Sequence, residues 1–218
     1  MMDCGPGSLL RLHQAGVSLQ DLKMILISHF HLDHVSDLLP VLHSRWLQNG
    51  RKTAATRIIG PYGLKRRFRG YMRSAKWVRE LDLELMEMGN DRLSFDGLSI
   101  DTGLTGHTQE SICFRLIDRD GRVLFYSGDA DDYQTLVALS SCADLALVEC
   151  SWPSAPAWEG HLTPEMAGRL AASGQVRQLL LTHFYQPVQR EDMMKEVAAV
   201  YEGPIELAED LKKYAIVK

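Results

Sequence analysis

Four side chains that can bind metal ions stand within six positions of one another near the start of the chain. They are His29, His31, Asp33 and His34, and they directly follow the apolar run Ile25-Leu26-Ile27. Imidazole nitrogen and carboxylate oxygen are ligands that zinc accepts, and a hydrolytic site also needs an open position for water. A buried core has no use for such a cluster, so we interpret it as a metal-binding loop.

One loop offers too few ligands for a complete site, so further ligands are expected elsewhere in the chain. Three candidates each follow an apolar segment that is predicted to be a strand, namely His107, Asp129 and His183. This shared position favours a common role. His13 and His43 lack such a context, and we interpret them as ordinary surface or core histidines.

Apolar runs alternate with amphipathic stretches along almost the whole chain, which is the pattern of strands interleaved with helices. This predicts an α/β fold, and 218 residues with 45% hydrophobic content fit a single domain, residues 1–218. The strands expected before the candidate residues span residues 23–28, 98–103, 122–127, 144–149 and 178–182. A helix is expected to begin near Val35, a hairpin turn at Asp120-Gly121, and another helix at Thr163-Pro164.

Composition argues against several classes of protein. The formal charge of −4 gives no overall attraction to nucleic acid or to anionic membranes. The four cysteines are far apart and form no C-x-x-C pair, which argues against a zinc ribbon or a redox dithiol. The sequence also has no apolar run of about 18 residues and no signal-peptide pattern. We therefore expect a cytoplasmic protein.

The segment His29-x-His31-x-Asp33-His34 resembles, without a substitution, the central motif of the metallo-β-lactamase superfamily of metallohydrolases. Asp3 in Asp3-Cys4-Gly5-Pro6-Gly7 and the residues His107, Asp129 and His183 are similar to its remaining motifs, in the same order and over nearly the whole chain. The resemblance implies an αββα sandwich with two divalent metal ions at one edge. Zinc is the default ion, with manganese or iron as alternatives.

The resemblance also implies how the ligands are shared. One metal ion would be bound by His29, His31 and His107, the other by Asp33, His34 and His183, with Asp129 bridging the two. Asp3 would orient the ligand loop, as carboxylates commonly do for metal-bound imidazoles. The alternative for Asp3 is an aspartate that caps a helix or stabilises a turn.

Two later side chains could return a proton to the leaving group. Glu149 ends a predicted strand, and His161 in Gly160-His161-Leu162-Thr163 precedes a helix. A glutamate followed by His-x-Thr resembles the phosphodiesterase branch typified by ribonuclease Z, where the pair donates a proton. We therefore assign catalytic roles to Asp33, His161 and Glu149. The alternative for His161 is a solvent-exposed neighbour of a helix cap.

Two divalent ions leave such a site net positive, so an anionic ester is the expected substrate. We predict a dinuclear hydrolase that cleaves phosphodiesters or related anionic esters through a metal-activated hydroxide. Only 21 residues separate His107 from Asp129, too few for the tRNA-gripping arm of ribonuclease Z, which favours small substrates over structured RNA. The alternatives are an arylsulfatase- or lactonase-like hydrolase and a catalytically silent, metal-binding scaffold subunit.

Residues 64–79 contain seven basic residues, no acidic residue and interleaved aromatic residues. Such a composition suits contact with a phosphate backbone. Because the chain as a whole is acidic, we favour a solvated helix face with Phe68, Tyr71 and Trp77 packed inward.

The chain begins at Met1-Met2-Asp3, whereas members of the superfamily usually carry several dozen residues before the Asp-x-Gly motif. Either the natural chain begins upstream of Met1, or the N-terminal strands of the sandwich are lacking and leave a sheet edge exposed. An exposed sheet edge invites pairing with another chain. A homodimer is the expected assembly, and no membrane partner is expected.

Overall fold

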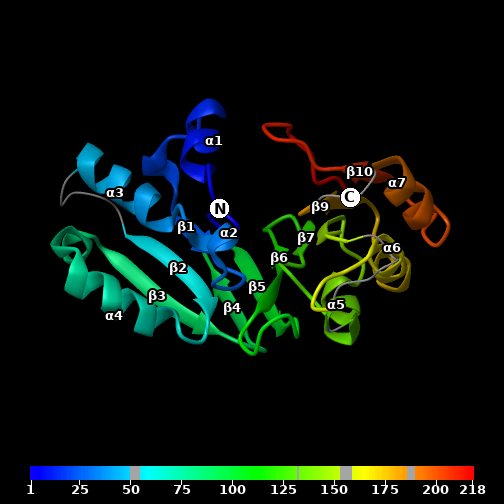
Figure 1. Ribbon diagram of the computed structural model, residues 1–218, viewed down its shortest axis with the longest axis horizontal. Coiled ribbons are helices and arrows are strands. Elements are labelled where there is room, and N and C mark those ends of the chain that lie inside the picture. Colours follow the sequence, from blue (N-terminus) through cyan, green and yellow to red (C-terminus); the bar gives the residue numbers. More distant parts are fainter. Residues whose placement is uncertain (50–54, 132, 153–158, 186–189) are drawn as a thin grey trace. The chain divides into compact units, whose positions relative to one another are not determined.

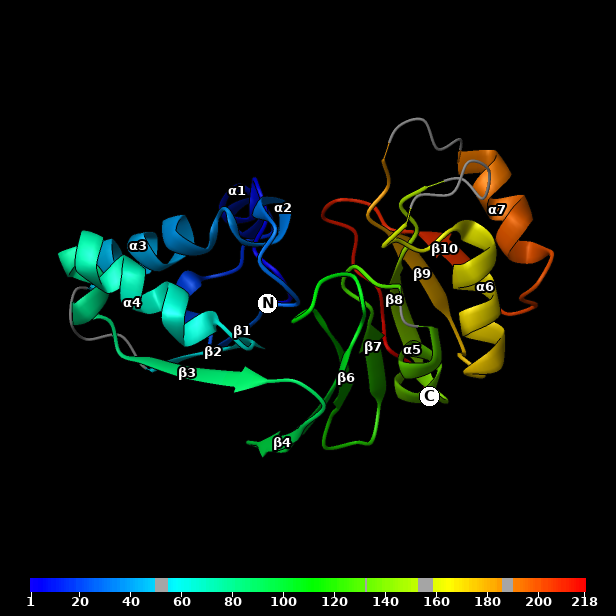
Figure 2. The same ribbon diagram turned by 60° about the horizontal axis from the view of Figure 1, so that its bottom comes forward.

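The computed structural model describes residues 1–49, 55–131, 133–152, 159–185 and 190–218 (Figures 1 and 2). The chain forms two compact units, Met1–Met88 and Gly89–Lys218, and each contains one β-sheet. Within the described ranges, no helix has both the length and the apolar character needed to cross a membrane. The predicted α/β class is confirmed in both units.

The first unit is built on a parallel sheet with the strand order β1-β2-β3. Its strands are β1 (Met24–Leu26), β2 (Thr56–Pro61) and β3 (Leu83–Met88). Its helices are α1 (Ser8–Gln14), α2 (Leu32–Val35), α3 (Leu38–Asn49) and α4 (Leu64–Ser74), with the 3-10 helices η1 (Leu19–Asp21) and η3 (Lys76–Glu80). Helices α3 and α4 lie along one face of this sheet (Figure 2).

The core of the first unit joins this sheet to its helices. Ile25 and Ile58 are fully buried on the strands, and Leu42 from α3 and Phe68 from α4 pack into the same cluster. Tyr71 and Trp77 pack against this cluster as well, so the predicted inward packing of the aromatic residues in segment 64–79 is confirmed. The loop that follows β1 is therefore attached to a strand that is packed firmly into this core.

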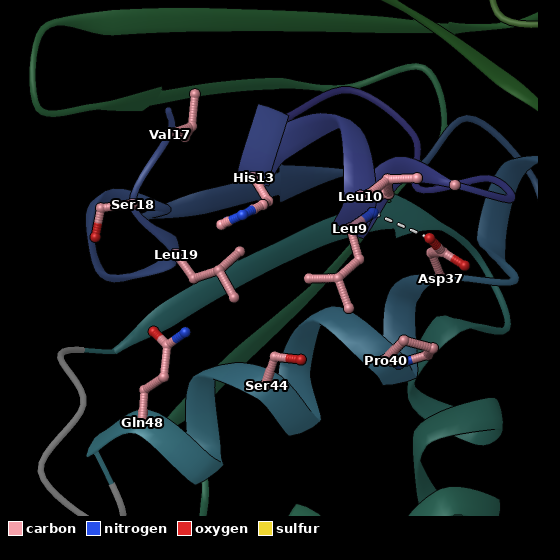
Figure 3. A pocket seen from close by; sticks show the side chains of 11 residues that line it. Leu9, Leu10, His13, Val17, Ser18, Leu19, Asp37, Pro40, Ser44 and Gln48 are labelled. Atoms are coloured by element: carbon pink, nitrogen blue, oxygen red, sulfur yellow. Dashed lines mark hydrogen bonds between the residues drawn. The ribbon is translucent and has the colours of Figure 1, made fainter. Parts of the chain in front are cut away.

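A pocket of about 710 Å³ opens between α1, the segment that leads to η1, and α3 (Figure 3). Its wall combines apolar residues such as Leu9, Leu19 and Pro40 with polar ones, among them His13 and Gln48. None of the candidate metal ligands belongs to this wall. His13 is exposed on α1, in line with its interpretation as an ordinary surface histidine.

The second unit contains a seven-stranded sheet with the order β10-β9-β8-β7-β6-β5-β4. Its strands are β4 (Arg92–Phe95), β5 (Leu98–Leu104), β6 (Ile112–Ile117), β7 (Val123–Tyr126), β8 (Leu145–Glu149), β9 (Leu179–Thr182) and β10 (Ile205–Leu207). The helices are α5 (Tyr133–Ser140), α6 (Pro164–Ser173) and α7 (Arg190–Ala198). They lie along one face of the sheet (Figure 2), over a core of fully buried residues such as Phe125, Val148 and Leu181.

Strand direction decides where the site can form in this unit. β6 is antiparallel to both β5 and β7, so β5 and β7 run in the same direction. β8 and β9 are parallel to β7. The carboxyl ends of β5, β7, β8 and β9 therefore lie at the same edge of the sheet, and the residues that follow them are brought to one place.

Most of the local predictions are confirmed. The predicted strands correspond to β1, β5, β7, β8 and β9, and Gly121 with a φ of 71° lies in the turn between β6 and β7. Thr163 caps α6 by accepting a hydrogen bond from the Met166 amide. The expected helix start near Val35 is wrong, because the ligand loop itself forms the short helix α2 and the longer α3 begins at Leu38.

We predict that Phe68→Ala lowers the free energy of unfolding by about 3–5 kcal/mol, because Phe68 is 1% exposed and its removal leaves a cavity in the first unit's core. Chemical denaturation would measure the change. Arg69→Ala, at the exposed neighbouring position, should stay within about 0.5 kcal/mol of the wild-type chain. Equal effects of the two changes would show that α4 does not pack as described.

Candidate metal centre

The loop after β1 brings the first group of predicted ligands together. The ring centroids of His29 and His31 are 4.6 Å apart and those of His29 and His34 are 4.1 Å apart. Asp33 Oδ2 lies 3.7 Å from His34 Nε2. His29 and His34 are buried, whereas His31 and Asp33 are exposed. The short helix α2 produces this grouping, since it turns the chain immediately after His31.

Asp3 holds two of these imidazoles in place. Its Oδ2 lies 2.7 Å from His34 Nδ1 and also accepts a hydrogen bond of 2.7 Å from Ser28 Oγ. His29 Nδ1 is 3.1 Å from the same hydroxyl, and the Ser28 amide donates to Asp3 Oδ1. Because Ser28 Oγ gives its proton to the carboxylate, both imidazoles donate through Nδ1 and keep Nε2 for a metal ion.

The backbone around Asp3 is fixed by its neighbours. The Asp3 amide donates to the Leu26 carbonyl of β1, and Met2 pairs with the same strand. Asp3 has a φ of 47°, a left-handed conformation that costs a non-glycine residue on the order of 1 kcal/mol. Surrounding contacts must supply that energy, and the carboxylate contacts to Ser28 and His34 are such contacts.

Gly5 allows the Asp3 segment to approach the ligand loop. A Cβ atom at Gly5 would lie 1.8 Å from the carbonyl oxygen of Asp33, a separation that no side chain can occupy. The Cys4 amide donates to the His34 carbonyl just beside this contact. Glycine at position 5 is therefore required for this packing of backbone on backbone.

The second unit brings together the candidates that follow its strands. Ligand atoms of Asp129, Glu149, His161 and His183 all lie within 4.8 Å of one another. Asp129 Oδ1 is 3.4 Å from His183 Nε2, and Asp129 Oδ2 is 3.7 Å from His107 Nε2. Asp129 is 2% exposed. This is the convergence that the common direction of β5, β7, β8 and β9 requires.

Hydrogen bonds fix the orientation of these imidazoles as well. His107 Nδ1 donates to the Gly160 carbonyl at 2.6 Å. His183 Nδ1 is 2.8 Å from Ser151 Oγ, which itself donates to Glu149 in a short hydrogen bond. In each ring Nδ1 therefore carries the proton, and Nε2 is the nitrogen that approaches Asp129.

Glu149 and His161 form a contact of 2.9 Å between Oε2 and Nδ1. The carboxylate is 1% exposed, and its Oε1 accepts a hydrogen bond from the Ala130 amide. The side chain of His161 is 12% exposed, so the alternative of a solvent-exposed residue near a helix cap does not describe it. The buried carboxylate accepts a hydrogen bond from this ring and fixes its orientation.

The donor set fits a divalent cation. The lone pairs on Nε2 of His107 and His183 and the oxygens of Asp129 point at one another, and such a group of acceptors is favourable only around positive charge. Neutral imidazoles and a carboxylate are ligands for zinc, manganese or iron. Thiolate ligands are not expected, because burial raises the pKa of the Cys4 thiol to about 12 and also raises that of Cys150.

Sequence reasoning did not identify the residues that anchor the imidazoles, which are Ser28, Ser151 and the Gly160 carbonyl. Ser28 precedes His29 directly and Ser151 follows Glu149 by two positions. Closeness to the motifs was the only signal, and serine is too common for that signal to be specific. His43 stacks with Trp46 and lies at a tilt of 51° to Trp77, which agrees with its interpretation as a non-ligand.

Comparison with known proteins identifies the family of this chain. Residues 1–184 match the Beta-lactamase superfamily domain. An uncharacterized protein of Mycobacterium leprae is 33% identical over 190 residues, which cover 83% of this chain and 66% of that protein, just under two thirds. A ribonuclease Z of Mycobacterium sp. (strain KMS) is 26% identical, with 99% of this chain and 85% of that protein covered.

A solved structure shows the same fold. The metallo-β-lactamase fold protein YhfI from Bacillus subtilis superposes with a TM-score of 0.81 and 22% identity, covering 96% of this chain and 83% of that one. The chain therefore belongs to the β-lactamase superfamily, a superfamily of metal-dependent hydrolases, and has the metallo-β-lactamase fold. The predicted resemblance and the predicted fold class are confirmed.

We predict that Gly5→Ala lowers the amount of zinc bound per chain, because the added methyl group forces the Asp33 carbonyl and the ligand loop apart. The strain should also cost about 1–3 kcal/mol of stability. Elemental analysis of protein refolded with zinc would measure the metal. Gly70→Ala is the control, since a Cβ there has no atom within 4 Å. Full zinc content in Gly5→Ala would contradict the described packing.

Proposed function

We propose that the two groups of ligands form one dinuclear metal centre that hydrolyses phosphodiesters or related anionic esters. The observation that carries this proposal is the contact between Glu149 and His161 beside Asp129, because it adds a proton donor to a set of metal ligands. The proposed ligands are His29, His31 and His107 for one ion and Asp33, His34 and His183 for the other, with Asp129 between them.

Divalent ions bound there would activate water as the nucleophile and polarise the scissile ester. The chain's own residues set the geometry. Asp3 and Ser28 keep the rings of His29 and His34 in one orientation, and Ser151 does the same for His183. Asp33 is the exposed carboxylate of the loop, and we assign it a catalytic role in orienting the attacking water.

His161 would supply the proton that the leaving oxygen needs. Glu149 accepts a hydrogen bond from Nδ1 of His161. The other ring nitrogen, Nε2, is therefore the one that exchanges a proton with the substrate. The buried carboxylate favours the imidazolium form between turnovers. Glu149 is itself positioned by Ala130 and Ser151, which keeps the pair aligned.

The relatives support a phosphodiester as the substrate class. The similarity to a ribonuclease Z of Mycobacterium sp. covers 99% of this chain. The short connection between His107 and Asp129 leaves no room for a long RNA-gripping arm, which supports a small substrate. Arylsulfate or lactone hydrolysis and a silent metal-binding scaffold are the competing functions that experiment must separate.

We also propose a location and an assembly for the protein, namely the cytoplasm and a homodimer. None of the four cysteines, all of which lie in the described residues, forms a disulfide, which suits the reducing cytoplasm. We propose a homodimer, for which the edge strand β3 with its half-buried residues is one available surface. In sedimentation experiments the mass of two chains is expected, and the mass of a single chain at micromolar concentration would refute the dimer.

We predict that zinc-loaded protein hydrolyses bis(p-nitrophenyl) phosphate and that removal of the metal by a chelator abolishes the activity. Parallel assays with p-nitrophenyl sulfate and a chromogenic lactone separate the ester classes. Faster turnover of the sulfate or the lactone would replace the phosphodiester in the proposal. Full metal content without turnover of any of the three would favour the scaffold.

We predict that His161→Ala lowers kcat by about 10²- to 10⁴-fold while the bound metal stays at the wild-type level, the usual scale for loss of a general acid. Glu149→Gln should lower kcat in the same direction. His13→Ala, a histidine exposed on α1, is the matched control and should keep wild-type kcat. Parallel loss of metal and activity in His161→Ala would contradict the proton-donor role.

A further inference from the structure

Helix α4 has a strongly cationic side. With about 100° of rotation per residue, Lys65, Arg66, Arg69 and Arg73 fall within an arc of about 100° of the helix surface. All four side chains are exposed. The opposite side carries Leu64 and Phe68 into the core of the first unit. We call these four side chains the α4 basic face.

The charge on this face is not cancelled by acidic side chains. In the described parts of the chain, none of the four basic residues makes an ion pair. The nearby carboxylate of Glu87 instead accepts hydrogen bonds from the backbone amides of Gly63 and Lys65 at the start of α4. The α4 basic face is therefore a local patch of about four positive charges on a chain whose net charge is −4.

The aromatic residues of the same segment do not share this surface. Phe68 is 1% exposed, and Tyr71 and Trp77 pack against the core. Base stacking, which usually accompanies single-strand recognition, is thus not what these rings provide. Three of the four cations are arginines, whose planar guanidinium groups suit paired hydrogen bonds to phosphate oxygens.

A fifth basic side chain of α4, which is not part of the α4 basic face, contacts the ligand loop of the same unit. Arg67, on the flank of α4, places its guanidinium carbon 4.2 Å from the centroid of the Phe30 ring. Phe30 stands between His29 and His31 in the sequence.

We infer that the α4 basic face binds the phosphate backbone of a nucleic acid strand without regard to base sequence. This goes beyond the proposed ester hydrolysis, since it assigns a partner to a surface that contains none of the metal ligands. We assign a nucleic acid strand to this surface because its negative phosphate groups complement the four positive side chains. Among the large exposed hydrophobic residues of the described chain, only Tyr62 lies near α4, just before the helix. This surface therefore lacks the apolar side chains that would insert into a membrane.

The test uses the full chain and a fluorescein-labelled oligothymidylate of about twenty nucleotides, longer than the usual single-strand site. The Kd is measured by fluorescence anisotropy at several salt concentrations. The variant R66Q/R69Q/R73Q should bind at least about tenfold more weakly at low salt. Its slope of log Kd against log salt should fall by about 2, because each lost phosphate contact to a single strand removes about 0.7.

Two further variants separate local charge from other effects. R119Q/R122Q/K195Q removes the same number of charges from the second unit, where each side chain already pairs with an aspartate, and should bind like wild type. R66K/R69K/R73K should retain most of the binding. Thermal unfolding checks that every variant remains folded.

Several outcomes would overturn the inference. These are equal weakening in the two glutamine variants, a salt slope unchanged by the α4 substitutions, or wild-type binding to phosphatidylserine vesicles in preference to the oligonucleotide. A strong dependence of Kd on the base composition of the probe would also overturn it, because phosphate contacts alone do not read bases.

Discussion

The candidate site depends on one constraint, which is that five of its imidazoles, those of His29, His34, His107, His161 and His183, are each held through Nδ1 by a group of the protein. Ser28 with Asp3, the Gly160 carbonyl, Ser151 and Glu149 serve as these anchors. These anchors decide the tautomer and the direction of the five rings before any ligand arrives. A histidine without such an anchor would rotate freely, and it would lose side-chain entropy on binding a metal ion.

The fold brings the anchors and the imidazoles together because several strands end at the same sheet edge. In the second unit, four strands that run in the same direction end at one sheet edge, and a residue with a polar side chain follows or ends each of them. In the first unit, β1 delivers the loop and the segment around Asp3 runs beside it. Asp3 (φ 47°) and His183 (φ 60°), two of the six described non-glycine residues with a positive φ, lie at this site.

The sequence predicted the scaffold well and its details less well. Long apolar runs such as Ile25-Leu26-Ile27 identify buried strands because no other element accepts them. The strand β4 was missed, since Arg92-Leu93-Ser94-Phe95 is short and lies at a sheet edge where burial is partial. The helix α2 was missed because four residues carry too little periodicity. The metal-competent residues were recognisable by type, but the serines that orient them were not, because serine occurs in many unrelated settings.

Ser151 has a single hydroxyl proton and two acidic or basic neighbours, Glu149 and His183. It therefore links the side chain proposed to move protons with one proposed to hold a metal ion. Replacing Glu149 frees the hydroxyl to turn toward His183, and this could change the tautomer of that ring. The losses in kcat caused by single replacements of Glu149 and of His183 should accordingly not add in the double mutant. Each replacement also disturbs the contact that the other residue makes with Ser151.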